Sequence, residues 1–356
     1  MSRQRIERIR RVLQKREADA IIITSLPDIR WACGFTGSNG VLIVGRDSAH
    51  FVTDMRYVEQ AAEEVRNASV HTPGYDLYGY IASAGLIGGV RIALFQAEYV
   101  TVANADVMRQ NHPSITWRLE QNILSDLVAR KDAKEVELIR RAQDVTERAF
   151  EEILGVLRPG ISERDIAAEL VYRQLKHGAE QMAFEPIVAS GPRGAMPHAR
   201  ASDKLMTVGE MVVLDFGCVV EGYASDMTRT VALGEPGSDA RNVYATVLDA
   251  QETAIAYARA GIKSAELDGR ARTVIDAAGY GEYFGHSLGH GIGLRTHEWP
   301  PVSFRSEAVL PARAAVTIEP GIYLPDKFGV RIEDLVLLNK NGCENLTRSP
   351  KQLIVL

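Results

Sequence analysis

The chain has 356 residues, which is more than one hydrophobic core usually fills, so we expect two domains. Hydrophobic residues make up 46% and charged residues 24% of the sequence, which is ordinary for a globular protein. The net charge of -5 argues against nucleic acid and anionic membrane surfaces as partners, because both attract an excess of Lys and Arg, and the apolar runs are too short to span a bilayer.

The first third of the chain alternates between helical and β-type patterns. Helical spacing covers residues 2–17, 54–65 and about 101–110. Short runs rich in β-branched and apolar residues cover 20–24, 40–44, 50–53 and 91–95. This alternation is typical of an α/β domain, which we expect to occupy residues 1–125.

The rest of the chain, residues 126–356, is predicted to form a second domain of a different type. Helical patterns cover about 133–157, 162–177, 238–260 and 264–278. Strand-like runs cover 211–219, 224–233, 314–320 and 329–338. This pattern is typical of antiparallel strands combined with helices, so we predict an α+β protein of two domains.

The cysteines give an indication of the compartment. The chain has three cysteines, Cys33, Cys218 and Cys343, which are widely spaced and lie outside any C-x-x-C motif. This odd number and wide spacing argue against a disulfide framework and against a cysteine zinc site. Residues 1–16 are rich in charge and lack the apolar segment of a secretory signal. We therefore expect a cytoplasmic protein with reduced thiols.

Two acidic residues, Asp215 and Asp226, lie in a run from 211 to 231 that is rich in Val. A carboxylate in such a run is costly to bury unless something compensates its charge. If the run forms a hairpin that turns between Val220 and Glu221, Asp215 and Asp226 face each other across the two strands. We therefore predict that their carboxylates are neighbours.

A similar pattern recurs near the end of the chain, where Glu319 and Glu333 lie in two β-rich runs. A turn centred on Asp326 brings these two glutamates opposite each other. Four acids directed into one apolar core repel one another strongly unless cations lie between them. We therefore predict a metal site, in which two divalent ions about 3.5–4 Å apart share bridging carboxylates.

Histidines supply the other candidate groups. Residues 285–298 contain three histidines and four glycines, and glycine allows close approach of the backbone. We assign His290 as a metal ligand and His297 as a donor that faces the substrate. His198 lies in a loop-like stretch and can stabilise an oxyanion or carry a proton. An imidazole among carboxylates suits Mn²⁺, which we expect first, and also Co²⁺, Zn²⁺ or Fe²⁺.

The motifs around these residues resemble those of the pita-bread metallopeptidases, a family that includes prolidase, aminopeptidase P, methionine aminopeptidase and creatinase. The five-ligand set of that family, Asp-Asp-His-Glu-Glu, falls on D-F-G, S-D-x-T-R-T, G-H-G-I-G, I-E-P-G and R-I-E-D. The resemblance therefore implies a C-terminal pita-bread catalytic domain with two metal ions, and its five ligands are Asp215, Asp226, His290, Glu319 and Glu333.

The resemblance also implies how the ligands share the two ions. Asp226 and Glu333 bridge the ions, Asp215 holds one of them, and the other ion is held by His290 and Glu319. In the family, the residue that matches Glu319 also takes the proton from the attacking water.

Four further residues have expected roles around the metal ions. His198 and His297 match the two substrate-side histidines of the family, and Arg331 matches the arginine that supports the site. We expect His286 to support the site without taking part in the reaction.

The first third of the chain resembles the N-terminal domain of the creatinase, prolidase and aminopeptidase P branch. The matching stretches are D-I-R-W-A-C-G-F-T-G-S-N-G at residues 28–40 and T-D-M-R-Y at residues 53–57. Methionine aminopeptidases usually lack this domain. The implied activity is that of an Xaa-Pro dipeptidase or an Xaa-Pro aminopeptidase, and the implied substrate is a small peptide with proline after the scissile bond. The implied assembly is a homodimer.

Substrate length and two other classes of function stay open. In several archaeal-type prolidases an arginine follows the H-E-W-P run, where this chain has Pro301. A dipeptidase needs a cation for the C-terminal carboxylate of its substrate, and Arg193, Arg295 or Arg305 could supply it. The alternatives to a peptidase are a creatinase-type hydrolase of a small C–N bond and an inactive binding module. Inactive relatives usually lose metal ligands, whereas all five are present here.

Overall fold

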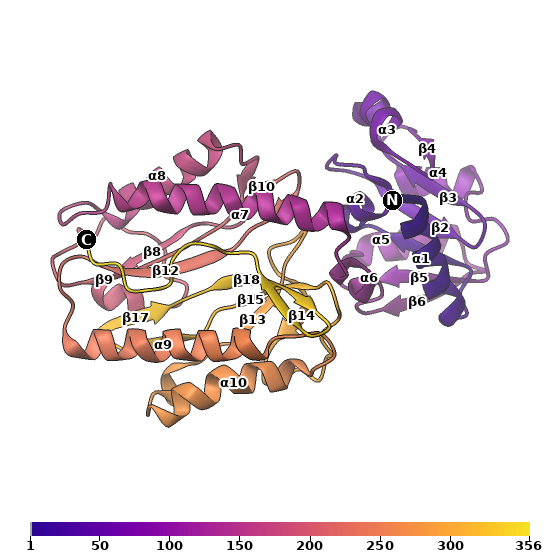
Figure 1. Cartoon of the computed structure of the whole chain (residues 1–356). Coiled ribbons are helices and arrows are strands. Elements are labelled where there is room, and N and C mark those ends of the chain that lie inside the picture. The colour runs from indigo at the N-terminus through magenta and orange to yellow at the C-terminus, as the bar shows by residue number, and fades with distance from the viewer. Residues whose placement is uncertain (1) are drawn as a thin grey trace. The chain divides into compact units, whose positions relative to one another are not determined.

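The structure is a computed structural model that describes residues 2–356, with side chains from Gln4 onward. The chain divides after Val128 into two compact units, each with its own helices and sheets (Figure 1). The predicted α+β architecture of two domains is confirmed. Among the described residues, no helix combines the length and the apolar character that a membrane span requires.

The first unit is built on one mixed sheet with the strand order β4-β3-β2-β1-β5-β6. The strand β1 pairs antiparallel with β2 and parallel with β5. The strands are β1 (Ala20–Ile23), β2 (Val41–Gly45), β3 (Ala49–Val52), β4 (Ser69–His71), β5 (Ile92–Gln96) and β6 (Thr116–Glu120). Ile21, Ile22 and Ile23 are all fully buried, so this central strand is covered on both faces of the sheet.

Short helices accompany this sheet. They are α1 (Ser2–Lys15), α2 (Leu26–Cys33), the 3₁₀ turn η1 (Met55–Tyr57), α3 (Val58–Glu64), α4 (Leu77–Ser83), α5 (Val102–Asn111) and α6 (Ser125–Ala129). In α1 the buried residues Ile6, Ile9 and Leu13 recur at helical spacing among Arg and Lys, so one apolar stripe holds this helix in the core.

The second unit contains several small antiparallel sheets. The three-stranded sheet β12-β9-β8 and the five-stranded sheet β14-β13-β15-β18-β19 carry most of the strands. The strands are β7 (Gln181–Met182), β8 (Ile187–Ser190), β9 (Met211–Phe216), β10 (Cys218–Val220), β11 (Tyr223–Ala224), β12 (Met227–Ala232), β13 (Gly289–Gly291), β14 (Glu298–Val302), β15 (Ala315–Ile318), β16 (Gly321–Leu324), β17 (Phe328–Arg331), β18 (Asp334–Asn339) and β19 (Gly342–Asn345).

Two pairs of helices cover these sheets. They are α7 (Ala133–Leu154) with α8 (Glu163–Lys176), and α9 (Ser238–Tyr257) with α10 (Ser264–Ala277), and Figure 1 shows the strands between the two pairs. The four helices predicted for this domain are therefore confirmed. Two short 3₁₀ turns, η2 (Gly191–Ala195) and η3 (Gly281–Tyr283), lie in the connections.

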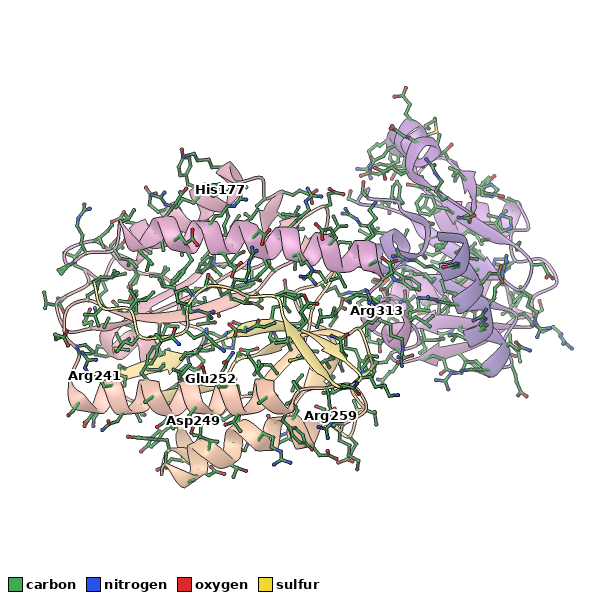
Figure 2. All side chains as sticks on the ribbon, in the orientation of Figure 1. His177, Arg241, Asp249, Glu252, Arg259 and Arg313 are labelled. Carbon is green, nitrogen blue, oxygen red and sulfur yellow. The ribbon has the colours of Figure 1, made fainter. Side chains whose placement is uncertain are left out.

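The two helix pairs pack on separate apolar cores. Phe150 of α7 and Leu170 of α8 are buried with residues of β8, β9 and β12, whereas α9 and α10 pack on residues of β15 to β18. The outer face of α9 is charged, and its exposed residues Arg241, Asp249 and Glu252 are labelled in Figure 2. The strands of this unit therefore lie in a layer between the two pairs of helices (Figure 1).

A buried carboxylate in the first unit gives a test of this fold. Asp54 accepts hydrogen bonds from Nε and Nη2 of Arg56, each at 2.9 Å, and from the Asn39 amide at 2.7 Å. The Arg56 side chain, followed by that of Asn39, holds the pKa of Asp54 well below its ordinary value.

We predict that Asp54→Asn lowers the free energy of unfolding by about 1–2 kcal/mol at pH 7, because hydrogen bonds to a charged group are lost. A lowered pKa stabilises the folded state above the unfolded-state pKa near 3.8, and this contribution disappears as the pH falls through the folded-state pKa. Urea unfolding of both proteins should therefore show a difference at pH 7 that shrinks below pH 4. A difference that is constant with pH would contradict the assignment.

Candidate functional site

The first pair of acids lies on the β9–β12 ladder. Asp215 is opposite Thr228, so the predicted direct pairing of Asp215 with Asp226 is wrong by two residues. The reason is the turn, because Glu221 and Gly222 both have positive φ and form a two-residue hairpin loop one position later than predicted. Residues two apart in a strand share a face, so Asp226 still lies on the face that Thr228 shares with Asp215.

The second pair of acids follows the predicted register. Ile318 is opposite Asp334 and Gly321 is opposite Arg331, so Glu319 and Glu333 lie at matching positions between these two pairs. The predicted turn at Asp326 is also confirmed, and Asp326 has a positive φ of 59°. However, the run 329–338 is two strands, because the ladder is interrupted next to Glu333.

His290 lies in β13, between two glycines that the packing requires. A Cβ atom on Gly289 would lie 2.1 Å from the carbonyl oxygen of Thr317, and one on Gly291 would lie 2.6 Å from that of Trp299. The expected close backbone approach is therefore present on both sides of His290. The ring Nδ1 of His290 lies 3.1 Å from the carbonyl oxygen of Gly291, which leaves Nε2 directed toward the acids.

A cavity of about 610 Å³ brings the candidate residues together. Its walls include all the residues that the sequence singles out as ligands, catalytic groups or supporting groups: His198, Asp215, Asp226, His286, His290, His297, Glu319, Arg331 and Glu333. Nε2 of His290 lies 3.6 Å from Oδ2 of Asp226 and 3.4 Å from Oε1 of Glu319. One ligand atom each from Asp226, His290 and Glu333 lies within 4.8 Å of the others, which is a spacing that a metal ion can bridge.

The carboxylates in this cavity destabilise one another when no cation is present. Burial, followed by the charges of Glu333 and Asp215, raises the pKa of Asp226 well above its ordinary value. Burial also raises the pKa of Glu333, together with the charges of Glu319 and Asp215. Burial raises the pKa of Glu319 to about 7, with an opposing effect from Arg331. The nearby histidine cannot neutralise the cluster, because burial lowers the pKa of His290 to about 3 and keeps the ring neutral.

These residues fit divalent metal ions. Oδ1 of Asp215 and Oε1 of Glu333 are buried and have no hydrogen-bond partner within the described part of the chain. A buried oxygen without a partner is costly, and a bound cation would remove that cost. Four carboxylates and one neutral imidazole nitrogen are also the donors that Mn²⁺ and related ions accept.

Two threonines, which the sequence analysis did not single out, orient the acids. The hydroxyl of Thr228 donates to Oε2 of Glu333 at 2.6 Å, and the hydroxyl of Thr317 donates to Oε1 of Glu319 at 3.0 Å. The Thr317 hydroxyl also accepts from the backbone N–H of His290. Their positions carry a signal, because Thr228 is two residues after Asp226 and Thr317 is two residues before Glu319, and such residues share a strand face.

Arg331 connects the acids to one of the supporting histidines. Its Nη2 donates to Oδ2 of Asp215 at 2.5 Å and its Nη1 donates to the hydroxyl of Tyr323 at 2.7 Å. That hydroxyl lies 2.9 Å from Nε2 of His286, whose Nδ1 lies 2.8 Å from the carbonyl oxygen of Ser287. Burial, followed by the charge of Arg331, lowers the pKa of His286 to about 4. Both ring nitrogens of His286 therefore have protein partners.

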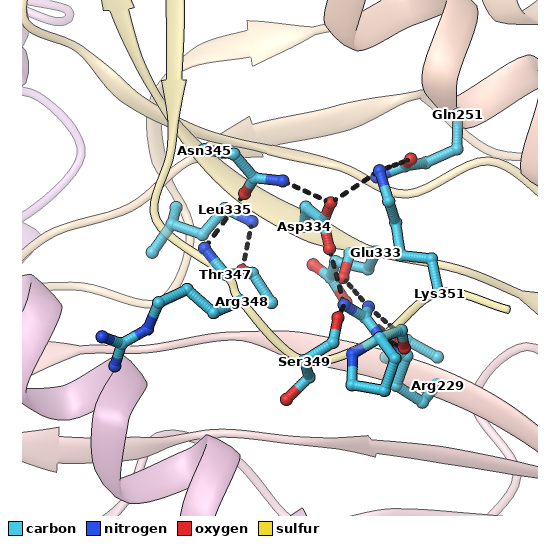
Figure 3. Close-up of polar contacts among 12 residues, drawn as sticks. Arg229, Gln251, Glu333, Asp334, Leu335, Asn345, Thr347, Arg348, Ser349 and Lys351 are labelled. Carbon is cyan, nitrogen blue, oxygen red and sulfur yellow. Dashed lines mark hydrogen bonds and ion pairs between the residues drawn. The ribbon is translucent and has the colours of Figure 1, made fainter.

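A second arginine supports the cluster from behind. Arg229 is 1% exposed and donates to the carbonyl oxygen of Glu333 at 2.6 Å and to Oδ1 of Asp334 at 2.8 Å. Figure 3 shows these contacts, and it also shows Asn345 and Lys351 of the C-terminal segment next to the Asp334 carboxylate. The backbone of Glu333 is thus held by buried charges while its carboxylate faces the cavity.

The two expected substrate-side histidines lie at the exposed side of the same cavity. The His297 ring packs edge-on against the His290 ring, with the centroids 4.1 Å apart. Burial lowers the pKa of His297, and the nearby Asp215 charge acts in the opposite direction. His198 is exposed and lies in the connection that follows η2.

We predict that Gly291→Ala destabilises the chain by about 1–3 kcal/mol and weakens Mn²⁺ binding, because its Cβ would collide with the backbone of β14 and displace His290. Gly285→Ala is the matched control, because no atom lies within 4 Å of its added Cβ. Urea unfolding and binding calorimetry measure both effects. Equal stability and equal Mn²⁺ affinity of the two variants would show that the position of His290 does not depend on this close approach of the backbone.

Comparison with known proteins places this site in a family. The profile of Metallopeptidase family M24 matches residues 137–340, and that of the Creatinase/Prolidase N-terminal domain matches residues 5–121. An Xaa-Pro dipeptidase of Pyrococcus horikoshii is 36% identical over 357 aligned residues, which cover 99% of this chain and 99% of that protein.

Solved structures agree with these matches. The Xaa-Pro dipeptidase from Bacillus anthracis is 38% identical with a TM-score of 0.97, and the alignment covers 100% of each chain. The X-Pro aminopeptidase from Thermotoga maritima MSB8 is 38% identical with a TM-score of 0.90, over 97% of this chain and 100% of that one. From the M24 match over residues 137–340 and the likeness along the whole chain, we conclude that the chain belongs to metallopeptidase family M24 and carries a creatinase/prolidase N-terminal domain.

Proposed function

We propose that the chain hydrolyses the Xaa-Pro amide bond of small peptides with two divalent metal ions bound in the cavity. The observation that carries this proposal is the set of four carboxylates and one imidazole on the cavity wall, where two buried carboxylate oxygens lack partners within the described residues. Relatives that are Xaa-Pro dipeptidases, or an X-Pro aminopeptidase, align with nearly the whole chain and support the choice of substrate.

The proposed ligands divide between the two ions. Asp226 and Glu333 would contribute to both ions, Asp215 would complete the set of one ion, and His290 and Glu319 would complete the set of the other. When bound, such ions supply Lewis-acid chemistry, since they polarise the scissile carbonyl group and lower the pKa of water. We propose Mn²⁺ as the preferred ion, because the set is rich in oxygen, and Co²⁺, Zn²⁺ or Fe²⁺ as alternatives.

Residues of the chain carry out the proton transfers and orient the substrate. Glu319 accepts a proton from the attacking water and delivers it to the nitrogen of the leaving proline, while Thr317 fixes the orientation of its carboxylate. His198 and His297 donate hydrogen bonds to the substrate carbonyl oxygen as negative charge develops on it. Arg331 holds the Asp215 carboxylate in place through their hydrogen bond.

The Mn²⁺-loaded chain is expected to release proline from Ala-Pro and to lose this activity in EDTA. Glu319→Gln should lower kcat by at least about 100-fold, because general acid–base catalysis contributes roughly 10²–10⁴-fold. Metal content of the variant is measured in the same samples by elemental analysis. Full turnover by a metal-loaded Glu319→Gln variant would contradict the role of Glu319. A metal-loaded wild-type chain that cleaves neither Ala-Pro nor an Xaa-Pro-Xaa tripeptide would contradict the Xaa-Pro assignment.

A dipeptide substrate needs a cation for its C-terminal carboxylate, and the lining of the cavity supports one candidate. Arg193, Arg295 and Arg305 do not line the cavity, whereas Arg200 does. The Arg200 side chain is 85% exposed, and it lies 3.6 Å from Glu185, which is also exposed. The Arg200 backbone is held by Arg193, whose Nη2 donates to the Arg200 carbonyl oxygen at 2.5 Å. We therefore propose Arg200 as the group that binds the C-terminal carboxylate of a dipeptide.

Arg200→Gln should raise KM for Ala-Pro by roughly five-fold, which is the size expected for an exposed charge pair. It should leave KM for Ala-Pro-amide unchanged, because that substrate has no terminal carboxylate. Arg305→Gln is the matched control, since Arg305 is an exposed arginine outside the cavity. Steady-state kinetics on both substrates measure the effect, and an equal change in KM for acid and amide would argue against Arg200.

We also propose a homodimer and a cytoplasmic location. The homodimer rests on the likeness of the first third of the chain to the creatinase/prolidase N-terminal domain. The location is supported by the cysteines, because Cys33, Cys218 and Cys343 are all free thiols. Light scattering of the purified chain tests the assembly.

A further inference from the structure

The connection that carries His198 has a defined start and end. It is the part of the β8–β9 loop that leaves β8 at Ser190, passes through η2 and comes back to the first turn of α8 at Ser202, where the backbone N–H of Arg164 donates to the Ser202 carbonyl oxygen. His198 and its neighbours Pro197, Ala199 and Arg200 form one side of the cavity. A connection of this length needs attachments if one of its side chains is to keep a fixed position, since backbone freedom costs roughly 1–2 kcal/mol per ordered residue.

A buried carboxylate joins the two ends of this connection. Glu163 is the first residue of α8 and is fully buried. Its Oε1 accepts from the backbone N–H of Ser190 at 2.8 Å and from the hydroxyl of Ser190 at 2.9 Å. Its Oε2 accepts from the backbone N–H of Ser202 at 3.1 Å, from the hydroxyl of Ser202 at 2.7 Å and from Nε of Arg193 at 2.8 Å. Oε1 therefore binds Ser190 at one end of the connection, and Oε2 binds Ser202 at the other end together with Arg193.

These hydrogen bonds stabilise the ionised form of the Glu163 carboxylate. Burial acts to raise the pKa of Glu163, but hydrogen bonds from Ser202, Ser190 and Arg193 outweigh it and hold the pKa below its ordinary value. A carboxylate at a helix N-terminus is also favoured by the helix dipole. Arg193 extends the contact further along the connection, because it also donates to the carbonyl oxygen of Arg200.

A second attachment lies close to His198. Nη1 of Arg331 donates to the carbonyl oxygen of Pro197 at 3.2 Å, while Nη2 of the same arginine binds Asp215. The backbone N–H of Ala199 donates to the carbonyl oxygen of Met196, which closes a tight turn around His198. The middle of the connection is thus held by the metal-site arginine, and both of its ends are held by Glu163.

We propose that Glu163 is a positioning residue for His198, which it holds at the cavity by joining the two ends of the 190–202 connection. The expected effect of Glu163 on catalysis rests on the proposed function of His198. Its expected effect on the order of the connection rests only on the contacts that Glu163 makes. Glu163 does not contact substrate or metal in this scheme, and its effect on the reaction passes entirely through the position of His198.

Glu163→Gln tests the proposal with little change in size. An amide keeps one acceptor oxygen, so whichever way it is oriented one end of the connection faces an NH₂ group and loses its acceptor. In the metal-free chain, the backbone amides of residues 191–201 should exchange with deuterium at least 10-fold faster than in the wild-type chain. With Mn²⁺ bound, kcat/KM for Ala-Pro should fall by roughly 10-fold, through the same parameter, kcat or KM, that His198→Ala changes.

Two comparisons separate positioning from general destabilisation. Glu152→Gln is the matched control, because Glu152 binds Arg173 and His177 at the other end of α8, away from the connection, and it should leave exchange of residues 191–201 unchanged. Adding Glu163→Gln to His198→Ala should cause no further loss of kcat/KM. Mn²⁺ affinity, measured by calorimetry, should stay within two-fold of the wild-type value.

Ser202→Ala provides a milder variant that removes one of the five donors, and it should give a smaller increase in exchange. Unchanged exchange in Glu163→Gln, or losses that multiply when it is combined with His198→Ala, would overturn the proposal. If the wild-type chain cleaves no Xaa-Pro peptide, the proposed function fails, and the exchange of residues 191–201 still decides whether Glu163 orders the connection.

Discussion

The second unit depends on one electrostatic constraint, which is that several carboxylates share a buried cavity. Asp215, Asp226 and Glu333 are nearly or fully buried. Burial, together with the like charges around them, raises the pKa of Asp226 and of Glu333. Arg331 faces Asp215, and its single charge is too little for the whole cluster. Divalent cations bound at the proposed ligands would supply the missing charge and would make the burial of these acids favourable.

The surrounding structure places each of these acids accurately. Glu333 has its carboxylate held by Thr228 and its backbone held by Arg229, so the orientation of the side chain is set from both directions. Glu319 and His290 are linked through the hydroxyl of Thr317. Such supporting contacts fix the geometry of a site before the ion arrives, which reduces the cost of binding. His198 and His297, which we propose as the substrate-side histidines, lie on connections between strands and need separate attachments.

Much of this site can be read from the sequence because acids within apolar strands are rare and costly. The register of Glu319 and Glu333 follows from a turn centred on Asp326, whose neighbours Pro325 and Lys327 are typical of a turn. The predicted register of Asp215 is wrong because Glu221 adopts a positive φ, which glutamate rarely does. The turn therefore lies one residue later than predicted.

Other features are invisible to local patterns because they depend on contacts between distant segments. Thr228 lies two residues from Asp226, but nothing in its own segment shows that its hydroxyl contacts the distant Glu333 carboxylate. Glu163 is also a typical residue for the first turn of a helix, and the sequence gives no sign that it joins Ser190 to Ser202. Arg200 could be distinguished from other arginines only when the cavity was known.

The number of metal ions bound per chain tests most directly whether the five proposed ligands hold two cations. The purified protein, stripped with chelator and then dialysed against dilute Mn²⁺, is measured by elemental analysis together with its protein concentration. We expect two Mn²⁺ ions per chain in the wild-type protein and fewer in Asp226→Asn, which removes one of the proposed ligands. A wild-type chain that binds no Mn²⁺, or Mn²⁺ binding that is unchanged in Asp226→Asn, would contradict the proposed metal site.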